Sequence, residues 1–198
     1  MPQSKPFYIA DVKKIRALAS PVRVAVVDAL EVLGPATIGQ VAAALGYPPD
    51  GLYYHFSVLE RHRIVVRAAP GRESGAVRFD LPGHPATLRY HLDDRRQGAA
   101  IATVVGTMAR NAERSFRRAF APGLATAGGS RRNLRAGRRT AWLTAAELQL
   151  LNRYLERIHG LFGRGRPQRH GARLHEFTYV LAPIVQRGRR GRSIPGAR

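Results

Sequence analysis

The side chains that most often carry out covalent or metal chemistry are scarce in this chain. It has no cysteine, which excludes thiol nucleophiles, thiolate metal sites and a disulfide framework. It contains neither the GxSxG motif of serine hydrolases nor a phosphate-binding P-loop. His170 and His175 are five residues apart in a loop-to-strand region, which is poor spacing for two ligands of one metal ion. We therefore expect no catalysis, no metal site and no cofactor.

A pair of adjacent tyrosines is the more informative feature. In the stretch "LYYHFSVLER", three apolar residues recur at helical spacing and should face a core: Leu52, Phe56 and Leu59. Tyr53 and Tyr54 are then left on the outward face. A tyrosine ring can contact an apolar methyl group while its hydroxyl forms a hydrogen bond, or the pair could pack against a neighbouring helix. His55 precedes core residue Phe56, which favours a half-buried structural residue over a ligand contact.

The positive charge is concentrated in the second half of the chain. The formal net charge is +20; residues 1–82 carry 10 basic and 7 acidic residues, whereas residues 83–198 carry 23 and 6. Of the 33 basic residues only three are lysines. This pattern fits attraction to a polyanion such as a nucleic acid. The alternative is compositional drift, which would place arginines on solvated faces without a partner.

Capping and turn signals divide the first 82 residues into four helices and a hairpin. Helical spacing predicts a helix over 7–19, and Ser20-Pro21 starts a second one that Gly34-Pro35 ends. Thr37 and Gln40 form a capping box for a third helix, which Gly46 should close in the left-handed conformation. Pro49 and Asp50 suit the first turn of a fourth helix, over 49–61. Two β-rich runs, at 64–69 and 77–81, are joined by a turn-rich segment and predict a hairpin.

This order of elements is that of a winged helix-turn-helix. The segments "LASPVRVAVVDAL", "TIGQVAAALG" and "LYYHFSVLERHRIV" resemble consecutive elements of the ArsR-type family of bacterial transcription regulators. The resemblance covers about residues 10–82. One departure is Arg63, where the family commonly has a glycine, so the end of the fourth helix is expected to be shaped differently.

The resemblance implies that the helix over 49–61 enters the major groove of DNA, where base edges carry the sequence code. Tyrosines would then read base edges, while arginines at the margins would neutralise phosphates. The DNA-binding residues that this implies are Thr37, Gln40, Pro49, Asp50, Tyr53, Tyr54, Ser57 and Arg61, with Arg67, Arg72 and Arg78 in the hairpin.

A long helical segment, 84–120, follows the winged domain of residues 7–82. Gly98 suggests a break between two helices within it. A single apolar stripe on such a segment needs a partner, and related regulators dimerise through terminal helices. The expected dimer residues are Leu92, Ile101, Val105, Met108, Ala112 and Phe116. Packing of the stripe back on its own domain is the alternative.

The remainder reads as a basic linker (121–137), a small strand-helix-strand unit (138–186) and a basic tail (187–198). Thr144 and Glu147 form a capping box, and "WLTAAELQLLNRYL" followed by "FTYVLAP" resembles the C-terminal extension of a subset of these regulators. Trp142, Tyr154 and Phe177 could line a ligand pocket or form the core of the unit.

Taken together, these patterns predict an α+β, mostly helical protein with an N-terminal winged helix-turn-helix. The expected function is that of a homodimeric, sequence-specific repressor in the cytoplasm. Its expected partners are double-stranded DNA, a second copy of the chain and an unknown small-molecule effector, with no membrane. The alternative is a basic RNA- or ribosome-associated protein that does not read DNA bases.

Overall fold

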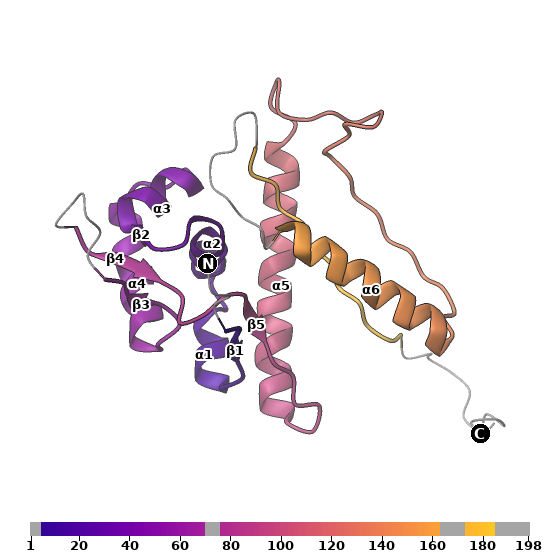
Figure 1. Cartoon of the computed structure of the whole chain (residues 1–198), viewed down its shortest axis with the longest axis horizontal. Helices are drawn as coiled ribbons and strands as arrows, with labels where there is room; N and C mark the ends of the chain where they lie inside the picture. The colour runs from indigo at the N-terminus through magenta and orange to yellow at the C-terminus, as the bar shows by residue number, and fades with distance from the viewer. Residues whose placement is uncertain (1–4, 70–75, 163–172, 185–198) are drawn as a thin grey trace.

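The chain forms an α+β, mostly helical fold with an N-terminal winged helix-turn-helix, against which a long helix packs (Figure 1). The computed structural model describes residues 5–69, 76–162 and 173–184. In chain order its elements are β1 (Phe7–Ile9), α1 (Val12–Ala17), α2 (Pro21–Leu33), β2 (Ala36–Thr37), α3 (Ile38–Leu45), α4 (Asp50–Arg61), β3 (Val66–Arg67), β4 (Arg78–Asp80), β5 (Ala86–Leu88), α5 (Arg95–Arg118) and α6 (Ala145–Phe162).

The helices α2, α3 and α4 confirm the predictions made from capping signals. Helix α2 begins at Pro21 after Ser20, although the Ser20 side chain makes no capping hydrogen bond. Helix α3 has a complete capping box: Gln40 N donates to Thr37 Oγ1 at 3.2 Å, and Thr37 N donates to Gln40 Oε1 at 2.9 Å. Gly46 has φ 67°, the left-handed conformation that glycine adopts without steric cost.

The predicted hairpin is confirmed, and it belongs to a three-stranded sheet. Strand β4 pairs antiparallel with β3, placing Val66 opposite Asp80, and with β2, placing Ala36 opposite Phe79. Phe79 is buried, and its ring lies 4.9 Å from that of Phe56 on α4. The sheet is therefore fixed to the helix whose outward face carries the tyrosines.

The predicted helix over 7–19 is wrong in its first turn. Residues Phe7–Ile9 form β1, which pairs in parallel with β5 at Ala86–Leu88. Helix α1 starts only after Asp11, whose Oδ1 accepts from Lys13 N at 2.8 Å and Lys14 N at 3.0 Å. The apolar spacing of this segment is compatible with either structure, and the strand partner, about 80 residues away in sequence, decides between them.

The predicted break at Gly98 is also wrong. Helix α5 runs without interruption from Arg95 to Arg118, and residues 86–88 are a strand rather than helix. Asp94 fixes the start of α5 by accepting from Arg96 N and Gln97 N. An N-cap residue outranks an isolated glycine as a boundary signal because the cap satisfies helical N–H groups that would otherwise lack partners.

The N-terminal half of α5 completes the core of the winged domain. Ala100, Ile101 and Val104 are buried in the cluster formed by α1 to α4. Three side chains of α5 donate hydrogen bonds to carbonyls of the preceding segments: Gln97 to Ala10, Thr107 to Ala19 and Asn111 to Pro21. The expectation that the stripe must find a second subunit is therefore wrong for this half of the helix.

The C-terminal unit contains its predicted helix but not its predicted strands. Helix α6 starts at Ala145 behind the predicted capping box, in which Thr144 N donates to Glu147 Oε2 at 2.8 Å. Within the described residues, neither 138–143 nor 173–184 pairs into a sheet. β-propensity alone forms no strand where no neighbouring segment completes the hydrogen bonds. Helix α6 has no buried residue, and Figure 1 shows it beside α5, away from the winged domain.

Arg63 sits at the end of α4 with φ 52°, and among the described residues it alone, apart from glycines, has a positive φ. This is the conformation that glycine adopts readily. The expectation that the end of this helix differs in shape from that of the family stays a prediction. Arg63 adopts the left-handed conformation at some steric cost.

Candidate nucleic-acid interface

The outward face of α4 presents both tyrosines to solvent. Leu52, Phe56 and Leu59 are buried, as predicted, and fix the rotation of the helix. Tyr53 is 59% exposed and Tyr54 is 69% exposed, so neither packs against a neighbouring helix. A large aromatic surface left in water on a helix rimmed by polar side chains is available to a partner.

The turn between α3 and α4 sets the angle at which this face is presented. Gly46 closes α3, and Tyr47 N donates to Ala42 O at 3.0 Å, which satisfies a carbonyl of the last turn. Pro49 then stands at the N-cap position, and Asp50 lies in the first turn of α4, at the positive end of the helix dipole. The orientation of α4 is therefore built into the backbone of the turn.

A groove runs between the start of α3, the side of α4 and the wing strands β3 and β4. Its lining residues are Thr37, Ile38, Gly39, Tyr53, Phe56, Ser57, Glu60, Arg67, Ala76, Val77 and Phe79. Four of the predicted contact residues therefore come together here: Thr37, Tyr53, Ser57 and Arg67. Gln40, Pro49, Asp50, Tyr54 and Arg61 are exposed on the same elements but do not line the groove. Arg72 lies outside the described residues.

The two described wing arginines, Arg67 and Arg78, form contacts with other groups of the chain. Arg67 Nε lies 2.7 Å from Glu60 Oε1 on α4, and Arg78 donates to the carbonyl of Pro35 before β2. Sequence reasoning missed Glu60 and Pro35 because neither pairing follows from local spacing. A phosphate at Arg67 has to compete with Glu60, whereas Arg78 braces β4 against the loop that enters the sheet.

His55 is half-buried, as expected, and contributes to the framework of the surface. Its Nδ1 is buried and has no hydrogen-bond partner in the described part of the chain. Partial burial, together with the charge of Arg23, lowers the pKa of His55. The ring packs edge-on against Tyr54 at 5.5 Å between centroids. The His55 ring thus packs against the exposed ring of Tyr54.

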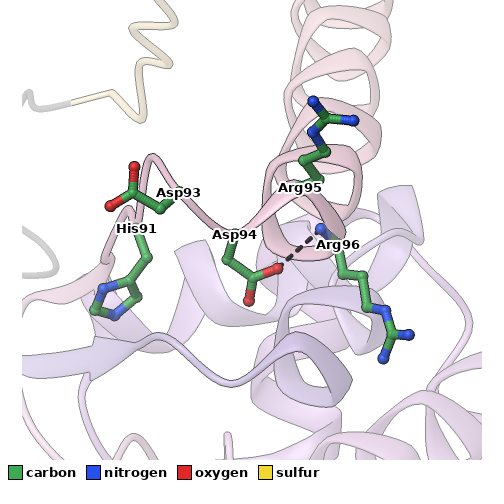
Figure 2. A pocket seen from close by; sticks show the side chains of 5 residues that line it. All are labelled: His91, Asp93, Asp94, Arg95 and Arg96. Atoms are coloured by element: carbon green, nitrogen blue, oxygen red, sulfur yellow. Dashed lines mark hydrogen bonds between the residues drawn. The ribbon is translucent and has the colours of Figure 1, made fainter.

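A second hollow lies at the start of α5 and is lined by His91, Asp93, Asp94, Arg95 and Arg96 (Figure 2). The labelled side chains diverge: Asp94 points to the helix, where it accepts from Arg96 N at 2.9 Å, while Asp93 points away from it. The carboxylate of Asp94 is occupied as a helix cap. These side chains do not converge on a common point, so the hollow offers no arrangement for acid–base chemistry.

The six predicted dimer residues do not form one surface. Ile101 is buried within the winged core, and Val105 and Met108 are partly buried against it. Leu92 is 95% exposed and precedes α5. Ala112 and Phe116 lie in the C-terminal half of α5, where Phe116 is exposed and stacks edge-on with Phe120. Of the large apolar side chains at this end of α5, Phe116 and Phe120 are exposed.

Trp142, Tyr154 and Phe177 do not form a buried core. Trp142 is 87% exposed, and the other two side chains are also exposed. Phe177 instead stacks with Tyr179 and lies near Phe162 at the end of α6. The expectation that they form the core of the unit is therefore wrong, and the pocket alternative stays a prediction.

The helix-turn-helix geometry agrees with the comparison to known families. A family model of a helix-turn-helix domain matches residues 18–68. These residues form a helix-turn-helix domain. The match spans α2 to β3 and includes the tyrosine-bearing face of α4. No curated protein matches the chain.

This domain supports a DNA-binding regulator, since helix-turn-helix modules place their second helix in the major groove and typically carry no catalysis. In the described part of the chain, no helix is long and apolar enough to cross a membrane.

Proposed function

We propose that the protein is a sequence-specific transcriptional repressor of the ArsR-like type, which reads DNA through α4. The observation that carries the proposal is the exposure of Tyr53 and Tyr54 on a helix whose opposite face is locked into the core. Ser57 and Thr37 lie on the adjacent groove and supply hydroxyls to base edges or phosphates.

The direct test compares operator and random DNA. The operator is first selected from a random pool by the purified protein. Tyr53→Ala and Tyr54→Ala are each expected to lower the ratio of operator to random affinity by about 5- to 150-fold, because a base contact contributes about 1–3 kcal/mol. Tyr90→Ala is the matched control, since Tyr90 is 60% exposed and precedes α5, outside the helix-turn-helix. Equal losses on both DNAs would remove the base-reading role.

We infer further that the protein acts as a homodimer, whose two α4 helices engage half-sites about 34 Å apart on one face of the duplex. The support is the exposed aromatic pair of Phe116 on α5 and Phe120 just after it, together with α6, on which no residue is buried. A dimer of this kind represses by occupying promoter DNA.

Phe116→Glu tests the dimer, with Leu92→Glu as its control. Both side chains are exposed in the monomer, so neither substitution disturbs its core. Light scattering should show monomers for Phe116→Glu and dimers for Leu92→Glu. Substituting Val105 or Met108 would be ambiguous, because these residues pack on their own domain. A Phe116→Glu protein that keeps the mass of a dimer would place the interface elsewhere.

A further inference from the structure

The segment between α5 and α6 carries a dense positive charge that the helix-turn-helix does not use. Between Glu113 and Glu147 the chain has eight arginines and no acidic residue. Five of these arginines belong to the segment 121–139, here named the arginine loop: Arg131, Arg132, Arg135, Arg138 and Arg139. All five are exposed, and none is paired with a carboxylate among the described residues.

The sequence alone suggests a flexible linker here, yet internal hydrogen bonds close the arginine loop. Asn133 Oδ1 accepts from Thr126 N at 2.7 Å, and Asn133 Nδ2 donates to Leu124 O at 3.1 Å. The backbone N of Asn133 donates to Thr126 O at 3.0 Å. Gly129 has a positive φ of 71° and lies in the turn between Thr126 and Asn133, directly before Ser130 and Arg131. Arg131 and Arg132 are thus carried on a closed turn rather than on a free chain.

Contacts with the C-terminal segment hold the loop at the end of α5. Arg173 donates to Gly123 O at 2.8 Å, and Ser115 on α5 donates to Glu176 Oε2 at 2.6 Å. Figure 1 shows the loop leaving the C-terminal end of α5 and then running alongside α6, on the side of α5 away from the winged domain and α4. A duplex lying on α4 therefore leaves the arginine loop free for a separate contact.

The composition of the loop favours the phosphate backbone of a duplex over single-stranded nucleic acid. Proteins that hold single strands stack bases on aromatic side chains. Between Phe120 and Trp142 the chain has no aromatic residue. Arginines without stacking partners neutralise phosphates and carry no sequence information.

We propose that the arginine loop is a second DNA-contact surface, which binds the phosphate backbone of duplex DNA independently of sequence and apart from α4. One chain can then contact two stretches of duplex at once. The proposal concerns affinity and bridging, and it stands whether or not Tyr53 and Tyr54 read bases.

The test removes one arginine pair from the loop and a matched pair from elsewhere. Arg131→Gln with Arg132→Gln is compared with Arg95→Gln and Arg96→Gln at the start of α5. Both pairs are adjacent and exposed, but Arg95 and Arg96 stand directly after Asp93 and Asp94. Binding to random-sequence duplex is measured over a range of salt concentrations. The slope of log affinity against log salt should become shallower by about 1.8 for the loop pair, since each phosphate contact contributes about 0.9. The control should keep the slope of the unsubstituted protein.

Bridging is measured by capturing a second labelled duplex on surface-bound DNA that has been coated with protein. The unsubstituted protein and the control pair should retain the second duplex, and the loop pair should lose it. A salt slope identical to that of the unsubstituted protein, or equal losses in both variants, would overturn the proposal. Tighter loop-dependent binding of single-stranded RNA or of anionic vesicles than of duplex DNA would also overturn it.

Asn133→Ala tests whether the closed shape of the loop contributes to its affinity for duplex DNA. It keeps every arginine but removes the two side-chain hydrogen bonds that close the loop. Affinity for duplex should fall by about 3- to 10-fold, because the arginines must then be ordered on binding. Unchanged affinity would show that the loop acts as unstructured charge and would contradict a built contact surface.

Discussion

Gln97 is a buried polar residue that attaches α5 to two other parts of the fold. Its side chain is 2% exposed. Its Nε2 donates to Ala10 O at 2.7 Å, in the link between β1 and α1, and its Oε1 accepts from His91 N at 2.6 Å. One side chain therefore joins three parts of the fold: the N-terminal link, the segment before α5, and α5 itself.

Gln97→Met keeps the size of the side chain and removes both hydrogen bonds. A buried polar group left without a partner costs about 1–3 kcal/mol. Two groups lose their partner, but His91 is exposed, so its N–H can turn to water at a smaller cost. We therefore expect a loss of about 2–3 kcal/mol, a large share of the roughly 5–15 kcal/mol that stabilises a typical domain.

Urea unfolding followed by far-UV circular dichroism measures this loss. With a slope of about 1–3 kcal/mol per molar urea, the midpoint should fall by about 1–2 M at constant slope. Gln149→Met on α6 is the matched control, because Gln149 is exposed, and it should leave the midpoint unchanged. A Gln97→Met midpoint within about 0.3 M of the unsubstituted protein would refute the reasoning, since it would mean that water satisfies both groups.

Three further substitutions test the framework around the interface. His84 lies between Glu31 Oε2 at 3.1 Å and Asp80 Oδ1 at 3.0 Å; partial burial lowers its pKa, but the two carboxylates outweigh burial and raise it above 6.5. The folded state then binds the proton more tightly than the unfolded state. The difference in unfolding free energy between the unsubstituted protein and His84→Gln should therefore be largest below pH 6.5 and should shrink as pH rises through the raised pKa. A difference that does not change with pH contradicts this. Thr37→Ala should cost about 1 kcal/mol in urea unfolding through loss of the α3 cap, and no loss would mean that the cap is redundant. Arg63→Gly should raise the unfolding free energy by about 0.5–1 kcal/mol by relieving the left-handed backbone, and a lower value would show that the arginine side chain matters more than the strain.

Sequence patterns located the helix-turn-helix because its signals are local. Thr37 and Gln40 are three residues apart, Gly46 directly follows the helix that it closes, and Leu52 and Phe56 are one turn apart. Each of these signals acts within one turn of helix, so its physical cause is visible in a short window.

The rest of the fold depends on partners that are distant in sequence. Phe7–Ile9 forms a strand because Ala86–Leu88 pairs with it. The buried side chain of Gln97 finds its hydrogen-bond acceptor in Ala10 O, far away in sequence. The same holds in the wing, where Arg78 donates to the carbonyl of Pro35. No spacing rule reports such a contact, so the wing arginines were predicted to be free for phosphates.

Charge is divided unevenly between the outward face of α4 with the adjoining wing and the arginine loop. On the face of α4 and the wing, Asp50 and Glu60 accompany Arg61 and Arg67, and Glu60 already forms an ion pair with Arg67. Such a face gains little from phosphates in general, so under the proposed function its binding energy would depend on whether base edges match the tyrosines and hydroxyls. The arginine loop has the opposite composition, since its charges attract any duplex and read none. If both proposals hold, placing the charge away from α4 would raise total affinity for DNA without making the outward face of α4 bind every sequence equally.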